Sequence, residues 1–304
     1  MNAKSSNNRP ACFSTKIDLK LASKLESDLH NQGFTLSKPA YTIFQAKKKN
    51  ISCTLYESGA LTVQGKDKDE FIEFYLEPEI LQTFHYSHGD LHLNLEPRIG
   101  VDEAGKGDFF GPLCVTALYA DGEGVKKLYD IGVKDSKRMA DKTVLKLADK
   151  IRKDFLHVTV RISPQKYNEL YQNFHNLNRL LGWGHATAIV DLARKTSCHK
   201  IVIDQFADES VVENAVARKN MTLNLEQKPR AEEDLVVAAA SICARASFLE
   251  GLEKLSKEID FSLPKGASSL ALRAGKKIVR QYGEDMLKRL SKAHFKTYAQ
   301  VLED

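Results

Sequence analysis

The sequence predicts an α/β protein built from two parts, and three observations lead to that prediction. At 304 residues the chain is longer than a typical single domain of roughly 100 to 150 residues. Its first part has the pattern of a small antiparallel sheet with a helix at each end. From Ile99 onward, consecutive strands give way to alternating helices and strands, which is typical of a mixed sheet covered by helices. We expect a first domain over residues 1–85, a linker over 86–97 and a second domain over 98–304.

The first part is expected to read helix, about three strands, helix. Apolar residues recur at helical spacing over 17–29, and Gly33 marks the end of that helix. A second helix is expected over 68–81, and no catalytic constellation is visible in this part. The three consecutive lysines at 47–49 could contact phosphates, but a solvated hairpin turn is the preferred interpretation. The expected strands cover 41–46, 51–56 and 60–64.

The second part has the longer and more apolar elements, including the nearly continuous apolar run 200–204, which is typical of a buried strand. Its most strongly helical segment contains four small residues, 238–241, which would allow a neighbouring element to pack very close. The expected strands cover 98–104, 113–119, 155–162, 200–204 and 221–227. The expected helices cover 142–153, 178–195, 209–218, 232–255, 268–282 and 284–290.

The composition is that of an ordinary soluble protein and excludes several classes. No apolar run approaches the roughly 20 residues that span a bilayer, and the polar first residues lack the apolar centre of a signal peptide, so we expect a cytoplasmic protein without membrane contact. The five cysteines form no C-x-x-C pair, which argues against disulfides and structural zinc. A formal net charge of +5 is only weak support for an anionic partner.

The chemistry begins at the stretch IGVDEAGKGDFFGPL, residues 99–113. Asp102 and Glu103 end an apolar run and are followed at once by Gly105, Lys106 and Gly107. Carboxylates at a strand end can hold a hard cation. Glycines around a lysine offer backbone N–H groups and a positive charge at close approach to a phosphate. The combination predicts metal-assisted phosphoryl chemistry.

Further carboxylates are expected from two other places in the chain. Asp204 ends the buried-type strand, so it would meet Asp102 if the two strands are neighbours. A fourth acid should come from the consecutive Glu232, Glu233 and Asp234 at the start of the Ala-rich helix, although two of these three are expected only to stabilise the helix N-terminus. Such a set suits Mg²⁺, which prefers oxygen ligands.

Other chemistries find little support in the sequence. The histidines show no H-E-x-x-H spacing, and most of them are interpreted as packing or surface residues. There is no G-x-S-x-G nucleophile elbow. The glycine-lysine-glycine turn lacks the spacing and the Ser/Thr of a P-loop, so ATP binding is not supported.

Five motifs in order give the chain a resemblance to a known family. They are VDEAGKGDFFGPL (101–113), VKDSKRM (133–139), GWGHATAI (182–189), VIDQF (202–206) and AEEDLVVAAASICARASF (231–248). Together they resemble the type 2 ribonucleases H, and within them ribonuclease HIII, over residues 98–297. A Gly-Lys-Gly turn in place of the Gly-Arg-Gly usual in ribonuclease HII, and a long N-terminal domain, favour the HIII group.

The resemblance implies a ribonuclease H-like mixed sheet flanked by helices, preceded by a small α+β domain similar to half of the TATA-binding protein fold. It implies an endonuclease that cuts the RNA strand of an RNA–DNA hybrid with Mg²⁺ or Mn²⁺, leaving a 5′-phosphate and a 3′-hydroxyl. The implied catalytic and metal-binding residues are Asp102, Glu103, Asp204 and Glu232, with Glu233 as the alternative fourth acid because the spacing to the Ala-rich helix is one residue short. The implied substrate-binding residues are Gly105, Lys106, Gly107, Ser136 and Lys137.

Two other functions remain open at this point. The first is incision beside single ribonucleotides in duplex DNA, as in ribonuclease HII. The second is a protein that binds hybrids in a salt-dependent way without cutting them. A monomer is expected, and the N-terminal domain is expected to add substrate affinity.

Overall fold

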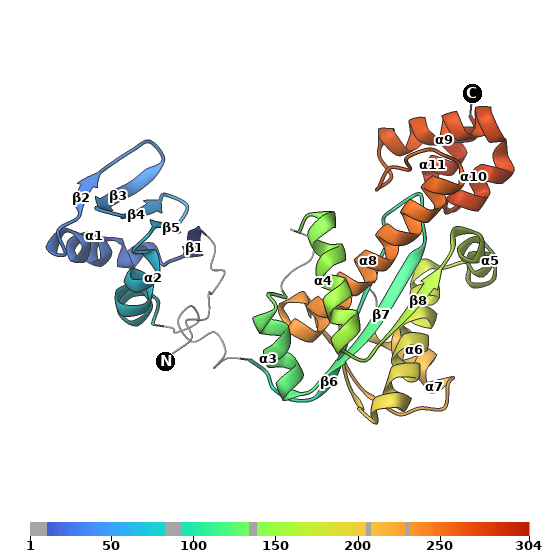
Figure 1. Cartoon of the computed structure of the whole chain (residues 1–304), viewed down its shortest axis with the longest axis horizontal. Helices are drawn as coiled ribbons and strands as arrows, with labels where there is room; N and C mark the ends of the chain where they lie inside the picture. The colour runs from blue at the N-terminus through green and yellow to red at the C-terminus, as the bar shows by residue number, and fades with distance from the viewer. Residues whose placement is uncertain (1–10, 83–92, 134–138, 205–207, 229–230, 304) are drawn as a thin grey trace. The chain divides into compact units, whose positions relative to one another are not determined.

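The computed structural model describes residues 11–82, 93–133, 139–204, 208–228 and 231–303, without the side chains of Glu209 and Glu232. The chain divides into two compact units, residues 1–93 and 94–304 (Figure 1). Most of the expected linker 86–97, and both Ser136 and Lys137, lie outside the described residues. Each unit is therefore considered by itself.

The N-terminal unit is a five-stranded antiparallel sheet in the order β1-β5-β4-β3-β2, with its buried side chains facing the helices. The three central strands lie where the sequence predicts them. The edge strands β1 and β2 were not predicted, because both are short and half exposed and so lack a clear apolar alternation. The strands are β1 (Cys12–Lys16), β2 (Thr35–Ser37), β3 (Thr42–Lys48), β4 (Ile51–Tyr56) and β5 (Ala60–Gly65).

The two helices of this unit differ in detail from the prediction. The first, α1 (Ala22–Asn31), begins later than residue 17, because Asp18 caps a separate 3₁₀ turn, Leu19–Leu21, ahead of it. The second begins as α2 (Lys68–Phe71) and continues as a π-helix, η2 (Ile72–Leu81). Pro78 lies inside this wider winding, and it has no N–H to donate to a regular α-helical ladder.

The second unit is built on a mixed sheet in the order β10-β9-β6-β7-β8. The strands β6, β7 and β8 form an antiparallel meander, whereas β9 and β10 run parallel to β6. This confirms the predicted mixed α/β sheet. The strands are β6 (Arg98–Ala104), β7 (Leu113–Ala120), β8 (His157–Ile162), β9 (Lys200–Asp204) and β10 (Asn224–Lys228).

Helices cover both faces of this sheet (Figure 1). The long helix α6 packs with α7 on the face that carries Ile99 and Val101, while α8 crosses the opposite face along β6 and β7. The short α3, α5 and α11 were not predicted; α4 and α9 lie close to their expected bounds. The helices are α3 (Gly122–Asp130), α4 (Asp141–Asp154), α5 (Pro164–Phe174), α6 (Leu177–Thr196), α7 (Glu209–Ala217), α8 (Leu235–Glu258), α9 (Ser269–Tyr282), α10 (Glu284–Leu290) and α11 (Lys296–Leu302).

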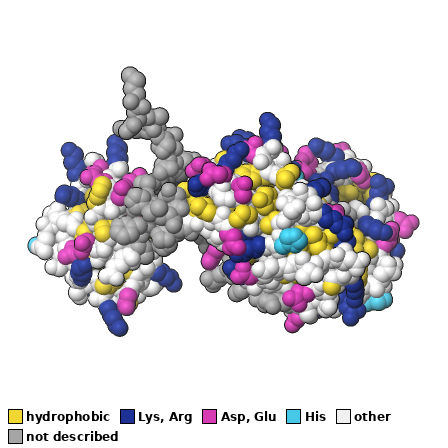
Figure 2. All heavy atoms as spheres, turned by 90° about the horizontal axis from the view of Figure 1, so that it is seen from below, with side chains coloured by type: hydrophobic (Ala, Val, Ile, Leu, Met, Phe, Trp, Pro, Cys, Tyr) yellow, Lys and Arg dark blue, Asp and Glu magenta, His cyan; other side chains and the backbone are white. Residues whose placement is uncertain are grey.

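Among the described residues, α8 alone is long and apolar enough to cross a membrane by length and composition. Of its most apolar window, 78% is buried inside the protein, which is what a core helix shows. On the face seen in Figure 2, basic and acidic side chains are interspersed, in keeping with the small net charge.

The sheet and α8 meet most closely at Gly100, where strand and helix backbones are in direct contact. A Cβ atom at this position would lie 2.4 Å from both the carbonyl carbon of Val236 and the amide nitrogen of Val237. Neither backbone atom can move without shifting α8. The small residue that permits this close contact is thus Gly100 in the strand, and the contact lies at Val236 and Val237, just before the small residues 238–241.

Replacing Gly100 by alanine should lower the free energy of unfolding by about 2 kcal/mol or more, because the added methyl group forces the helix away from the sheet. Denaturant unfolding of the full chain measures this change. The matched control is Gly107→Ala, since nothing lies within 4 Å of a Cβ built there. Equal stability of the two variants would contradict the close contact.

Candidate active site

The predicted carboxylates come together at the joint between β6 and β9. These two strands are parallel neighbours, with Val101 paired to Ile203, so the next position on each strand brings Asp102 beside Asp204. Glu103 follows Asp102 in the same strand and points to the opposite face of the sheet. Three of the four predicted acids therefore lie at one end of two adjacent strands.

Asp102 is held on the side of the sheet that faces α8. Its Oδ1 accepts the backbone N–H of Glu103 at 2.7 Å, and its carboxylate is also hydrogen-bonded to the hydroxyl of Ser241. The side chain is buried, with 8% of the residue exposed. Burial, followed by the negative charges of Glu103 and Asp204, raises the pKa of Asp102 to about 7. Negative charge thus accumulates here without full compensation.

Glu103 has the opposite environment on the α6 side. Its Oε2 accepts a hydrogen bond from Nε2 of the fully buried His185 at 3.1 Å, and Nζ of Lys106 lies 3.5 Å from its Oε1. Burial acts to raise the pKa of Glu103, but the hydrogen bond from His185 and the charge of Lys106 outweigh it and hold the pKa below its usual value. Glu103 is therefore ionised at neutral pH.

Asp204 connects the strand to the segment that carries the fourth predicted acid. Its Oδ1 accepts the backbone N–H of Ala231 at 3.0 Å. Residues Ala231–Glu233 form a 3₁₀ turn, η5, rather than the first turn of α8 as expected. The Asp204–Ala231 hydrogen bond places the backbone of Glu232 next to Asp204, while the exposed Glu233 follows it.

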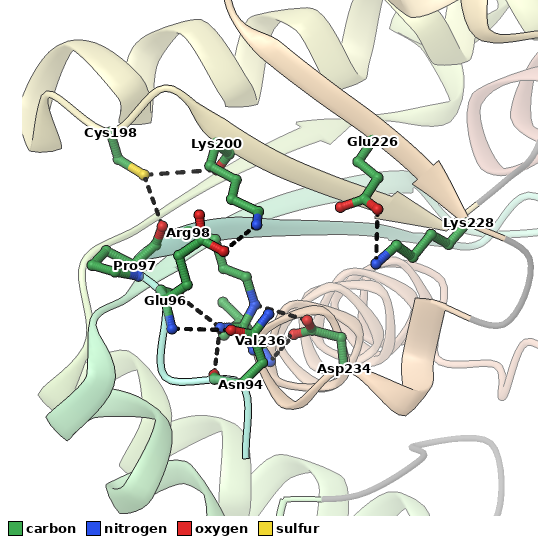
Figure 3. A network of polar contacts seen from close by, with 10 residues as sticks. All are labelled: Asn94, Glu96, Pro97, Arg98, Cys198, Lys200, Glu226, Lys228, Asp234 and Val236. Carbon is green, nitrogen blue, oxygen red and sulfur yellow. Dashed lines mark hydrogen bonds and ion pairs between the residues drawn. The ribbon is translucent and has the colours of Figure 1, made fainter. Parts of the chain in front are cut away.

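Asp234 is the N-cap of α8, which agrees with a stabilising role for one of the three consecutive acids. It accepts the backbone N–H of Val236 at 2.8 Å. It also forms a two-pronged ion pair with Arg98, at 2.7 Å from Nε to Oδ2 and 3.0 Å from the second guanidinium nitrogen to Oδ1 (Figure 3). Arg98 is almost completely buried and donates further to the carbonyls of Asn94 and Glu96. The start of β6 is therefore tied to the start of α8.

The glycine-rich turn has two different glycines. Gly105 has a φ of +88°, and a Cβ there would lie 2.2 Å from the carbonyl oxygen of Pro112, so the fold requires glycine. No described atom lies within 4 Å of a Cβ at Gly107, and the turn is open on that side. Lys106 was predicted to bind substrate, and its Nζ lies 3.5 Å from Oε1 of Glu103, so its side chain is directed toward the carboxylates.

The segment after the turn is fastened by a buried lysine, Lys292. Its Nζ donates to the carbonyls of Asp108 and Gly111 at 2.7 and 2.8 Å. Burial lowers the pKa of Lys292 to about 7. The backbone of Lys292 also donates to Phe109 at 2.9 Å, so the turn is anchored to the C-terminal helices.

The sequence reasoning missed the residues that support the carboxylates. His185 was grouped with the packing histidines, and Ser241 and Arg98 were not singled out, although His185 and Ser241 lie within quoted motifs. In the sequence, His185 lies 82 positions from Glu103, Arg98 lies 136 from Asp234, and Ser241 lies 139 from Asp102. No local spacing could therefore reveal these pairs.

The donor set fits a divalent cation chemically. Asp102, Glu103 and Asp204 offer only carboxylate oxygens, which are the ligands that Mg²⁺ and similar hard cations prefer. Among the residues whose side chains are described, which excludes Glu232, no three His, Cys, Asp or Glu side chains already form a metal-binding group.

The pKa of Asp102 predicts how the metal-free protein responds to pH. A carboxyl whose pKa is higher in the folded than in the unfolded state stabilises the fold at low pH, and this contribution is lost as the pH rises through about 7. In the presence of a chelator, Asp102→Asn should therefore gain stability relative to wild type between about pH 5 and pH 8, by about 1 kcal/mol or more. Chemical denaturation at several pH values measures this.

Glu103→Gln is the matched control for that experiment. The pKa of Glu103 is lowered in the folded state, so its contribution is lost only as the pH falls below the ordinary range of a glutamate. The difference between Glu103→Gln and wild type should stay flat over the same pH interval. Parallel pH profiles for Asp102→Asn and Glu103→Gln would contradict the assignment.

The ion pair of Arg98 makes a second prediction about stability. Asn caps a helix about as well as Asp, so Asp234→Asn keeps the cap but removes the charge that compensates buried Arg98. The free energy of unfolding should fall by about 3 kcal/mol. Asp208→Asn is the control, because Asp208 caps α7 in the same way on an exposed surface, and it should change stability little. Equal effects would mean that the ion pair contributes nothing.

Comparisons with known proteins show which family this chain resembles. A family model described as Ribonuclease HII matches residues 99–298, and one described as a domain of unknown function (DUF3378) matches residues 13–87. The chain is 54% identical over 290 residues to the ribonuclease HIII of Protochlamydia amoebophila, covering 95% of this chain and 96% of that protein. It is 48% identical over 294 residues to the ribonuclease HIII of Chlamydia felis, covering 96% and 97%.

Solved structures show the same relationship. The crystal structure of Bst-RNase HIII in complex with Mn²⁺ matches with a TM-score of 0.67 at 28% identity, over 96% of this chain and 98% of that one. The structure of Aquifex aeolicus RNase H3 matches with a TM-score of 0.55 at 25% identity, over 92% and 98%. The resemblance inferred from the five motifs is confirmed, and this chain belongs to the ribonuclease HIII family of type 2 ribonucleases H.

Proposed function

We propose that this chain hydrolyses the RNA strand of RNA–DNA hybrids at Asp102, Glu103, Asp204 and Glu232, leaving 5′-phosphate and 3′-hydroxyl ends. The observation that carries the proposal is the placement of three acids at one end of the neighbouring strands β6 and β9, within a chain of the ribonuclease HIII family. The backbone of Glu232 adjoins Asp204, which supports Glu232 over the exposed Glu233 as the fourth acid.

These four residues would hold Mg²⁺ or Mn²⁺, because both ions accept oxygen ligands. When bound as a pair, such ions activate a water molecule and stabilise the leaving oxygen of a phosphodiester. The related Bst-RNase HIII was crystallised with Mn²⁺, which supports a divalent cation in this family. We propose that either ion serves here.

The supporting side chains keep the acids ready for this role. His185 and Lys106 hold Glu103 in its charged form, which is the form that ligates a cation. Ser241 and the N–H of Glu103 orient the carboxylate of Asp102 from two directions. The buried positions of both acids also limit the access of bulk water.

The turn Gly105, Lys106 and Gly107 is proposed to meet the minor groove of the hybrid, where 2′-hydroxyls mark the RNA strand. The open space at Gly107 supports this, because no described part of the protein requires glycine there.

Ser136 and Lys137 are proposed to contact the substrate backbone. The exposed lysines Lys47 and Lys49 at the β3–β4 hairpin would let the N-terminal unit add affinity in a monomeric, cytoplasmic enzyme.

The activity is tested by Asp102→Asn, which should lower kcat on an RNA–DNA hybrid by roughly a thousandfold or more with either metal, because a ligand of the cation is lost. Asp191→Asn, the same chemical change on the exposed surface of α6, should cleave like wild type. Cleavage of hybrid, duplex DNA and DNA with one ribonucleotide is compared with Mg²⁺ and with Mn²⁺. Cleavage by Asp102→Asn at the wild-type rate would contradict the assignment.

The same substrates distinguish the remaining alternative. Incision only beside the single ribonucleotide would indicate an activity like that of ribonuclease HII. Preference for a run of ribonucleotides supports the proposed activity on hybrids.

A further inference from the structure

A second site lies away from the carboxylates, in a pocket of about 590 Å³ between the end of α5, the start of α6 and α7. Its volume is within the range of small-ligand sites, about 300 to 1,000 Å³. The lining residues that carry the argument are Phe174, Arg179, Trp183, Asn214, Arg218 and Lys219.

The charge of this pocket is one-sided. Arg179, Arg218 and Lys219 line it, and no acidic side chain is among its described lining residues. None of these three cations forms an ion pair with a described acidic residue. The pocket therefore favours an anionic ligand.

Aromatic side chains add a second requirement. Trp183 and Phe174 are both half-buried and line the same pocket as the cations. An indole ring offers a flat face on which a nucleobase can stack, and stacking of this kind tolerates any base. Asn214 offers an amide that can both donate to and accept from the edge of a base. A simple inorganic anion would leave the aromatic faces unused.

The pocket is connected to the active site through α6. Trp183 precedes His185 by two residues, so the two side chains point to opposite sides of the helix. His185 contacts Glu103, and the pocket therefore lies on the opposite side of α6 from this contact. The helix α7 forms the other wall, and its N-cap, Asp208, lies four residues after Asp204 in the chain.

We propose that this pocket binds a single unpaired nucleotide, with its base against Trp183 and its phosphate against Arg179, Arg218 and Lys219. The nucleotide comes from a single-stranded extension of the substrate or from a free mononucleotide. The first source rests on the proposed nuclease function, whereas binding itself does not. A strand that leaves the hybrid beside the carboxylates has to cross only one helix to reach the pocket.

The chain contains a single tryptophan, and that residue lies in the pocket. Its fluorescence is therefore a direct measure of ligand binding to the full-length protein, in chelator and independent of cleavage. Adenosine 5′-monophosphate should quench it saturably, and inorganic phosphate, adenosine and polyglutamate should quench it far less. Equal quenching by phosphate or by polyglutamate would reduce the pocket to a general anion site and overturn the proposal.

Substitutions connect this signal to the pocket. Arg179→Ala and Arg218→Ala should each raise the dissociation constant of adenosine 5′-monophosphate about five- to tenfold, through loss of a charged hydrogen bond at an exposed position. Arg273→Ala on α9 makes the same chemical change on an exposed surface elsewhere and should bind like wild type. Wild-type affinity in both pocket variants would overturn the proposal.

The source of the nucleotide is decided in the Asp102→Asn background, in which a hybrid is not consumed. A hybrid with an unpaired extension should bind more tightly than the blunt hybrid, and this ratio of dissociation constants should fall to one in Arg179→Ala. Quenching by the mononucleotide without any effect of the extension identifies a free nucleotide as the ligand. If wild-type protein does not cut the hybrid but its fluorescence is still quenched by adenosine 5′-monophosphate, the result counts against the nuclease function and not against the pocket.

Discussion

The contact between β6 and α8 is the constraint on which the rest of the second unit depends. Alternate residues of this strand face the helix: Arg98 pairs with Asp234, Gly100 touches the helix backbone, and Asp102 bonds Ser241. Because side chains alternate along a strand, this face sets the depth, position and register of the helix at three successive points. An extra methyl group at Gly100 or a lost charge at Asp234 would shift α8 relative to β6. The same shift would change the contact between Asp102 and Ser241 at the end of the row.

The opposite face of the same strand is matched to α6. Ile99 and Val101 join the hydrophobic core under this helix, and Glu103 then meets His185. Two adjacent acids are thereby held by two different helices on two sides of one sheet. Their environments shift their pKa values in opposite directions. The pKa of Asp102 is raised by burial and by two nearby negative charges, whereas the pKa of Glu103 is lowered by its histidine and lysine partners.

The helix α6 also joins the active site to the cationic pocket. Its inner side presents His185 to the carboxylates, and its outer side presents Trp183 to the pocket. The small residue Gly182 lets α7 approach, since a Cβ there would come within 2.7 Å of Val211. Substrate chemistry and the proposed nucleotide binding thus depend on the placement of one rigid element.

The sequence by itself determined the two-part α/β organisation, the central strands and long helices, and the acids Asp102, Glu103 and Asp204. These follow from apolar periodicity and from acids at the ends of apolar runs, which are local signals. Only the tertiary structure decided that Glu232 lies in a 3₁₀ turn next to Asp204, and that His185, Ser241 and Arg98 support the site. The physical reason is that these contacts join residues far apart in the chain, which become neighbours only when β6, β9 and their covering helices pack together.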